Sequence, residues 1–246
     1  MKKIYDVLSP RKTKTIRILG LFVLFFSTIL ITVNMLYTNV TGIVEHPKYW
    51  EFKTVFGPFY HLLYFTNISN VFLGIMIVAL VLKPSCKLRQ NLFFVSVILI
   101  SITFVVYWLL ISWGQPWKDP IIITTSITTH GIHPLIGFVV LYLMRKEIKL
   151  TRQVIFISSA IVLTYFFFAL VLYLVTGAPY KFKDGAIIYS FMHFRRPFFT
   201  TTSNLGLIIA LDLLIFVIGA FIPVIFAFLW KLLFNLKVTL KRQMKH

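Results

Sequence analysis

Charged residues are scarce in this chain. They make up 13% of its 246 residues, and Asp and Glu together number 7, whereas a soluble domain usually carries about a quarter charged residues. Hydrophobic residues account for 59%, and apolar runs of more than twenty residues separate short charged clusters. Runs of that length can span the hydrocarbon core of a bilayer. The composition therefore excludes a soluble globular domain and predicts an integral membrane protein.

Cysteine is nearly absent as well, since Cys86 is the single thiol of the chain. One cysteine cannot form an intrachain disulfide, which excludes a fold stabilised by disulfides. Cys86 lies in a short basic connection between two apolar runs, and we expect its thiol to be inert.

The shortage of acidic residues leaves a formal net charge of +18, which by itself would also suit a nucleic-acid-binding protein. However, 18 of the 25 Lys and Arg residues lie in four clusters at alternate ends of the apolar runs. Cytoplasmic loops of membrane proteins show this excess. We therefore expect no nucleic-acid partner, a bacterial plasma membrane location and cytoplasmic N- and C-termini. The basic loops and tail would contact anionic lipids of the inner leaflet.

Six apolar runs predict an all-α fold, a polytopic membrane bundle that forms a single transmembrane domain over residues 1–246. The expected helices lie near residues 16–37, 59–82, 91–113, 121–144, 153–176 and 205–230. Between the last two runs, the segment from Gly177 to Asn204 is too apolar for a solvated loop. We expect it to lie on the membrane surface or to dip into it. The basic tail is expected to continue the sixth helix along the inner surface.

Polar side chains inside the predicted spans are informative because they are costly to place in lipid. In the second span, Thr66 and Asn70 are four residues apart and share one helix face. In the fourth span, His130 and His133 are three residues apart and precede Pro134. A proline cannot donate to the carbonyl four residues before it. We therefore expect a free backbone acceptor at His130 and a helix that faces protein or a wet cavity.

Asp212 is an acidic residue inside the sixth predicted span, at a depth that matches that of Thr66 when residues are counted along the helices. A carboxylate in hydrocarbon has to be paired, protonated or in contact with water. We therefore expect Thr66, Asn70, His130, His133 and Asp212 to converge in the outer half of one bundle.

Structural roles compete with functional ones for several of these residues. The Thr66 hydroxyl could bond back to the carbonyl of Leu62, and Asn67 and Asn70 could hold neighbouring helices together. Two histidines beside a proline are less easily explained in that way. The other histidines near the outer interface are expected to be solvated; they are His46, His61 and His193.

The segments LLYFTNISN (residues 62–70) and HGIHP (residues 130–134) resemble the six-transmembrane family of androgen-induced proteins, whose bacterial members are called proline-rich six-transmembrane proteins. The resemblance covers the whole chain at the level of topology. Family members described as enzymes hydrolyse fatty acid esters of hydroxy fatty acids, using an intramembrane threonine nucleophile and a histidine. The resemblance implies that Thr66 is the nucleophile and that His133, which closes the His-Gly-x-His stretch after His130, is the histidine.

The leading hypothesis is therefore an intramembrane hydrolase that acts on fatty acid esters or related lipids. Neutral His133 would take the proton of the Thr66 hydroxyl. Asn67 or Asn70 would donate a hydrogen bond to the oxyanion that develops on the substrate. The substrate would come sideways from the membrane lipids, and no cofactor is expected.

In that hypothesis His130 or Asp212 would orient His133. Two rival hypotheses use the same three ionisable residues differently. The first is a non-enzymatic membrane protein with a small-solute or proton pathway through a cavity lined by His and Asp. The second is a zinc site, which is least favoured because only the two histidines have suitable spacing.

Overall fold

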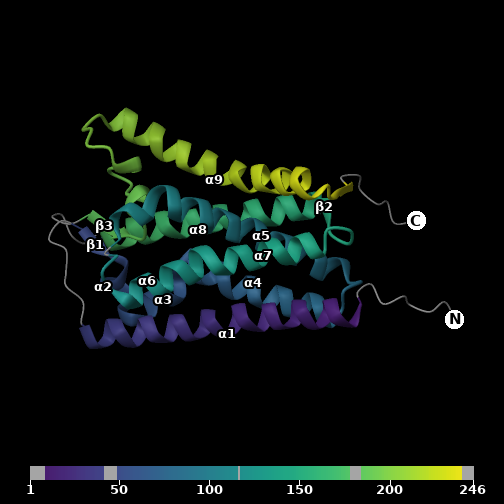
Figure 1. Ribbon diagram of the computed structural model, residues 1–246. Helices are drawn as coiled ribbons and strands as arrows, with labels where there is room; N and C mark the ends of the chain where they lie inside the picture. Colours follow the sequence, from purple (N-terminus) through teal and green to yellow (C-terminus); the bar gives the residue numbers. More distant parts are fainter. Residues whose placement is uncertain (1–8, 42–48, 116, 178–183, 240–246) are drawn as a thin grey trace.

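The computed structural model describes residues 9–41, 49–115, 117–177 and 184–239 (Figure 1). These residues contain six helical spans that are long and apolar enough to cross a membrane. The spans are Pro10–Thr41, Phe52–Leu82, Lys87–Gly114, Pro120–Leu143, Arg152–Gly177 and Leu205–Phe234. The predicted all-α membrane bundle is therefore confirmed, although the first two spans begin earlier along the chain than expected.

The spans are of two kinds, continuous helices and helices assembled from shorter pieces. The continuous ones are α1 (Pro10–Thr41), α8 (Arg152–Gly177) and α9 (Leu205–Phe234). The second span consists of α2 (Phe52–Phe56), η1 (Gly57–Phe59), α3 (Tyr60–Leu63) and α4 (Phe65–Leu82). The third consists of α5 (Lys87–Val106), η2 (Tyr107–Ile111) and η3 (Ser112–Gly114), and the fourth of α6 (Pro120–Ile127), η4 (Thr128–Ile132) and α7 (His133–Leu143).

The helix α1 begins and α9 ends at the same end of the bundle (Figure 1). The short connections 83–86 and 144–148 and their basic neighbours lie there too, and we call it the basic end. The opposite end is called the cavity end. The breaks in the three interrupted spans lie closer to it than to the basic end. The two names are used below without reference to the sides of a membrane.

The chain after α9 does not continue as a helix along the membrane, so that prediction was wrong. Asn235 adopts the left-handed conformation with φ of 50°, and α9 ends before it at Phe234. A left-handed residue is a common helix stop. The chain then forms β4 (Lys237–Thr239), which pairs in parallel with β2 (Lys149–Thr151) at the basic end. The rest of the tail lies outside the described residues.

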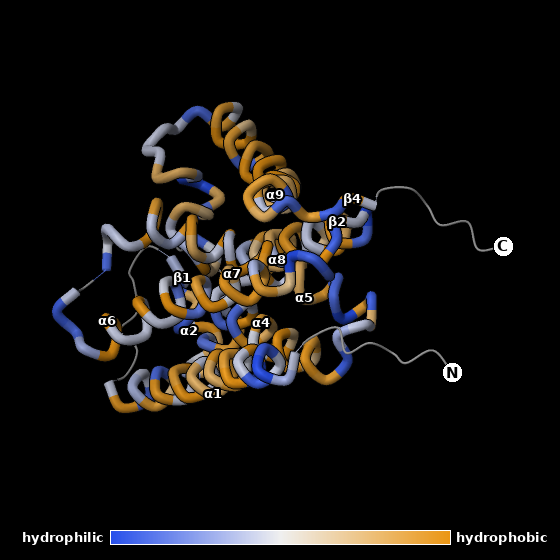
Figure 2. Tube along the Cα trace, turned by 45° about the vertical axis from the view of Figure 1, so that its right-hand side comes forward, coloured by the Kyte–Doolittle hydropathy of each residue, from blue (hydrophilic) through white to orange (hydrophobic). Residues whose placement is uncertain are grey.

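The helix α5 lies at the centre of the bundle, and its residues from Phe93 to Thr103 are all buried. Beside it, α1 and α4 cross at short distance, because a Cβ atom at Gly74 would lie 2.7 Å from the backbone nitrogen of Leu24. Small residues allow such close packing where lipid supplies no hydrophobic force between helices. Figure 2 shows apolar residues along the length of α1 and α9, as expected for helices exposed to lipid.

The segment of residues 184–204, called here the outer segment, folds back onto the cavity end. Its strand β3 (Asp184–Ile187) pairs in parallel with β1 (Tyr49–Glu51). The short helices η5 (Ser190–Met192) and η6 (Pro197–Phe199) follow. Apolar side chains of this segment are buried against α8 and its neighbours. The segment therefore packs against the bundle and is not a free loop, and its placement on or in the membrane stays a prediction.

Candidate active site

The second span is interrupted one residue after α3, at Tyr64. That residue has extended backbone angles, with φ of −65° and ψ of 132°. The hydroxyl of Tyr165 on α8 bridges the break, since it donates to the carbonyl of Leu63 at 3.0 Å and accepts from the amide of Phe65 at 3.1 Å. Thr66 therefore lies in the first turn of α4, where backbone N–H groups have no partner within the helix.

Two other interruptions, the π-helical segments η2 and η4, are in contact with each other. The ring of Tyr107 from η2 stacks on the ring of His130 from η4, with centroids 3.6 Å apart and planes 6° apart. Single π-helical turns inside helices are often found at functional sites. The stack holds the His130 imidazole in one orientation, with 8% of the residue exposed.

The carbonyl of His130 accepts a hydrogen bond from the indole N–H of Trp108 at 2.8 Å. Pro134 lacks the N–H that would otherwise bond to this carbonyl, so the free acceptor expected from the sequence is used by the neighbouring helix. The bond ties η4 to η2 beside the Tyr107–His130 stack. The proline thus contributes to the site through the backbone acceptor that it leaves open.

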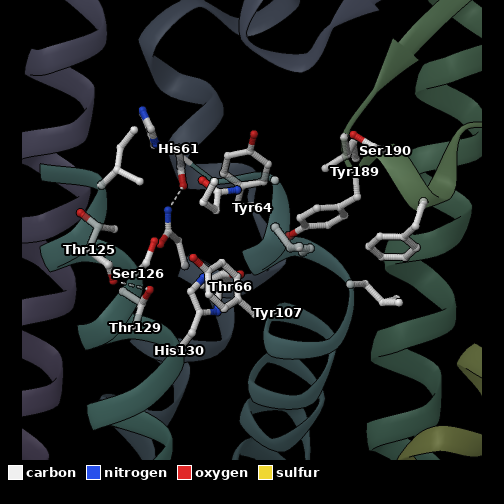
Figure 3. A pocket seen from close by; sticks show the side chains of 18 of the residues that line it. His61, Tyr64, Thr66, Tyr107, Thr125, Ser126, Thr129, His130, Tyr189 and Ser190 are labelled. Atoms are coloured by element: carbon white, nitrogen blue, oxygen red, sulfur yellow. Dashed lines mark hydrogen bonds between the residues drawn. The ribbon is translucent and has the colours of Figure 1, made fainter. Parts of the chain in front are cut away.

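A polar cavity of about 570 Å³ lies at the cavity end, between α1, α3, α4, η2, α6, η4 and the outer segment (Figure 3). Thr66, Asn67 and His130 are among its lining residues. Thr125, Ser126 and Thr129 add hydroxyl groups from the fourth span. This wall is polar enough to hold water within a bundle that is otherwise apolar.

A second, apolar cavity of about 280 Å³ adjoins the first and lies between α4, α5, η2, α8 and α9. Thr66, Tyr107, His130 and Tyr189 line both cavities. The hydroxyl and the imidazole proposed from the sequence therefore lie where a polar space and an apolar space meet. An ester is a molecule with that division, because its polar carboxyl group is attached to a hydrocarbon chain.

Comparison with known proteins does not identify a family. No family model, no curated protein and no solved structure matches this chain.

His133 is separated from these cavities, although the sequence places it beside His130. It is 0% exposed, is not among the residues lining either cavity, and its Nδ1 lies 2.8 Å from Oδ1 of Asn70. The amide nitrogen of Asn70 donates to the carbonyls of Thr66 at 2.8 Å and Thr129 at 3.1 Å. Because those donations fix the amide orientation, Nδ1 of His133 carries the proton and donates to Asn70. The pair joins α4, η4 and α7.

Asp212 does not join the other candidate residues. It lies on α9 close to Tyr173 of α8, and it is not among the lining residues of either cavity. Within the described part of the chain, its Oδ1 has no hydrogen-bond partner. The expected convergence of Asp212 with Thr66 and His130 is therefore not seen.

Asn67 lines the polar cavity, and its amide donates to the carbonyl of His61 at 2.6 Å. His61 is itself 9% exposed and lies 2.9 Å through Nε2 from the hydroxyl of Thr38. His193 is 7% exposed. The expectation of solvated outer histidines was therefore wrong for these two, because the outer segment and α1 cover them, and His46 lies outside the described residues.

Sequence reasoning missed the tyrosines that surround Thr66. Burial raises the pKa of the Tyr189 hydroxyl, and its hydrogen bonds with the side chains of Thr66 and Tyr165 act in the opposite direction. Tyr189 belongs to the outer segment, Tyr165 to α8 and Tyr107 to η2. Aromatic residues near span ends are usually read as interface anchors, and Tyr165 in the middle of α8 has no acidic residue or histidine in its span that would single it out.

A zinc site finds no support in the geometry. Among the described residues, no group of three or more His, Cys, Asp and Glu side chains is arranged to hold a metal ion. His130 lines both cavities, whereas His133 and Asp212 line neither.

Proposed function

We propose that this membrane protein hydrolyses fatty acid esters or related lipids inside the bilayer, with Thr66 as nucleophile. One observation carries the proposal: Thr66 and His130 line the junction of a polar cavity with an apolar one, within the membrane-spanning bundle. An ester placed across that junction has its carbonyl beside a hydroxyl and an imidazole. Its acyl chain lies in apolar surroundings and its hydrolysis product can leave through the polar cavity.

His130 replaces His133 as the general base in this proposal. The imidazole of His130 shares both cavities with Thr66, and its Nδ1 has no hydrogen-bond partner among the described residues. The Nε2 of His133 also has no hydrogen-bond partner among the described residues, but His133 is 0% exposed and lines neither cavity. A base has to reach the proton that it removes, directly or through one water, and this requirement favours His130.

The reaction takes place in two steps in which all protons are accounted for. The Thr66 oxygen attacks the ester carbonyl while His130 takes the hydroxyl proton, and His130 then protonates the departing alkoxide to release an alcohol. Water from the polar cavity, deprotonated by His130, then attacks the carbonyl carbon of the acyl–threonine ester. The fatty acid leaves and the proton returns to Thr66.

Donors for the oxyanion lie close to Thr66. The Tyr189 hydroxyl is hydrogen-bonded with Thr66. The backbone N–H groups in the first turn of α4 have no acceptor within the helix. Asn67 has a second amide hydrogen besides the one given to His61. Donors of this kind, fixed where negative charge develops, usually supply the largest part of catalysis in acyl transfer.

Asn70 and His133 act as positioning residues in this proposal. Asn70 holds the carbonyl of Thr66 in α4 and that of Thr129 in η4. It therefore sets the distance between the nucleophile and the turn that carries His130. The resemblance to androgen-induced proteins, carried by the same two segments, supports the same reaction and its restriction to lipid esters.

A solute or proton pathway is less well supported. It would require His130, His133 and Asp212 to line one passage, whereas His130 lines the cavities, His133 is sealed behind Asn70 and Asp212 lies near Tyr173. No specific observation favours it.

Labelling of the purified protein in detergent by a fluorophosphonate probe tests the proposal. The probe should modify the wild-type protein, and fatty ester turnover should fall with labelling. Thr66→Ala should abolish both, while Thr28→Ala on the exposed face of α1 should leave both unchanged. Labelling that persists in Thr66→Ala, together with undiminished turnover, would remove Thr66 from the mechanism.

A further inference from the structure

We propose that the apolar cavity binds one unbranched hydrocarbon chain, the acyl chain of the substrate, which enters from the membrane between η2 and α9. The inference rests on the proposed esterase function and adds a substrate class to it. The substrate is an ester that joins a straight acyl chain to a more polar partner, with the partner held in the polar cavity.

The cavity wall is suited to a hydrocarbon chain. Apart from its junction with the polar cavity, the lining is dominated by aliphatic and aromatic side chains of α5, α8 and α9. On α9 the lining residues Ile215, Ile218, Gly219 and Ile222 follow the spacing of one helix face. That face extends over about 10 Å at 1.5 Å per residue. The cavity is therefore long along the helix axis, as a straight chain requires.

The cavity extends away from the polar junction towards the middle of the bundle. Its lining residues farthest from the cavity end are Ile102 on α5, Val162 on α8 and Ile222 on α9. Ile102 and Val162 are buried, at 7% and 2% exposed. These three side chains thus close the deep end, and the length of chain that fits is limited by them.

The opening to lipid lies on one side of the cavity. Leu109 of η2 and Ile218 of α9 both line the cavity and are 66% and 43% exposed on the outside of the bundle. Two exposed apolar residues that also form the inner wall mark a thin boundary with the lipid phase. A chain anchored in the bilayer can pass there without entering water.

A glycine allows α9 to approach α8 closely at the wall of the cavity. Gly219 of α9 lies against the ring of Phe166 on α8, which also lines the cavity, and a Cβ atom at that position would overlap the ring. A side chain at this position would displace the Phe166 ring in the cavity wall. A space of about 280 Å³ that extends along the helix axis favours a straight chain over a branched or fused-ring lipid.

Filling the deep end tests the inference. Ile222→Trp and Val162→Phe should reduce turnover of a long-chain ester by about tenfold or more, with turnover of a short-chain ester of the same alcohol retained. Leu213→Trp, on the same helix but 61% exposed, is the matched control and should not alter chain-length preference. Equal losses for short and long chains in both deep variants, or an unchanged preference, would overturn the inference.

A measurement that needs no turnover separates this inference from the esterase proposal. An ester with a diazirine near the end of its acyl chain is photolysed with Thr66→Ala protein, and the adducts are mapped by mass spectrometry. Adducts should fall on the deep-end residues and be displaced by unlabelled long-chain ester. Such adducts in a wild-type protein without esterase activity would keep the chain site and reject the esterase. Adducts confined to lipid-facing residues such as Leu213 would reject the chain site even if ester hydrolysis is found.

Discussion

Thr66 and His130 reach the same cavity because the helices that carry them are both interrupted nearby. Tyr64 breaks the second span just before Thr66, and the π-helical turn η4 presents His130 together with its free carbonyl. Such interruptions are tolerated in a membrane when other groups satisfy the released backbone atoms. Here Tyr165 and Trp108 do so. The side chains of Tyr165 and Trp108 therefore help to bring the Thr66 hydroxyl and the His130 imidazole to the same cavity.

Replacing Thr66 tests its role as nucleophile against a purely structural one. Thr66→Ala should abolish ester turnover without loss of protein, because the hydroxyl is not required to hold α4. Thr66→Ser keeps the hydroxyl and loses a methyl group, so it should retain part of the activity. Turnover is measured per unit of folded protein, judged by its elution in detergent. Equal activity of the alanine variant and wild type would contradict the assignment.

The two histidines form a matched pair for a second prediction. His130→Ala should remove turnover with little effect on thermal stability, since its ring contributes a base and one aromatic stack. His133→Ala leaves Oδ1 of Asn70 buried without its donor, a change that costs about 1–3 kcal/mol. It should lower the unfolding midpoint and reduce turnover less than His130→Ala. Thermal unfolding and turnover of both variants are compared side by side. The reverse order of activities would restore His133 as the base.

At the scale of elements, the outer segment completes the site, because it brings Tyr189 to Thr66 and covers both cavities. It is held to the rest of the bundle by β1 and by the contact of Gly185 with Tyr173, and the ion pair of Arg195 with Asp184 at 2.9 Å joins two parts of the segment itself. The site therefore depends on how closely this segment packs on α8.

A glycine substitution should loosen that packing. Gly185→Ala places a methyl group against the backbone carbonyl of Tyr173, which cannot move aside within α8. The outer segment should shift away, with faster tryptic cleavage after the exposed Arg195 and lower ester turnover. Gly206→Ala is the matched control, since a Cβ atom there would have its nearest neighbour at 3.4 Å. An unchanged cleavage rate in Gly185→Ala would show that the contact does not hold the segment.

Acid should weaken the internal fold of the outer segment through His193. Burial lowers the pKa of His193, although Asp184 opposes the shift, and its Nδ1 accepts the amide of Arg195 at 3.2 Å. The unfolded imidazole titrates near about 6.5, above the folded group. The contribution of neutral His193 to the free energy of unfolding is therefore fully present above the unfolded pKa, and it is lost as pH falls through the folded pKa. Thermal unfolding midpoints of the wild type should decline over this range, while those of His193→Gln should decline less. Parallel curves would contradict the assignment.

At the scale of the whole molecule, α9 stands out because little of it is covered by protein: 11% of its most apolar window is buried, against 61% for the third span. It packs on α8 and α5 (Figure 1) and forms one wall of the apolar cavity. A helix bounded by lipid on most sides is suited to let a lipid chain pass beside it.

Orientation in the membrane is a property of the whole chain and is tested by cysteine labelling. In a Cys86→Ser background, Ser85→Cys marks the basic end and Ser203→Cys the cavity end. The excess of basic residues predicts that an impermeant maleimide labels the second variant in intact cells and the first only after permeabilisation. External labelling of Ser85→Cys would place the basic end outside and reverse the predicted orientation.

The six spans could be predicted from the sequence because each has to satisfy its own backbone hydrogen bonds in lipid. The length of each apolar run and the position of the charges are then enough to locate a span, without knowledge of its neighbouring helices. The same reasoning identified Thr66, Asn70, His130, His133 and Asp212 as costly residues to place in hydrocarbon. It also predicted the free carbonyl that Trp108 occupies.

Which of these residues meet was decided only by the tertiary structure. Counting along a helix gives depth, but the direction of a side chain around the bundle depends on helix rotation, at 3.6 residues per turn. The break at Tyr64 and the π-helical turns η2 and η4 change that rotation locally. His130 therefore lines the same cavities as Thr66, while His133 contacts Asn70 and Asp212 lines neither cavity.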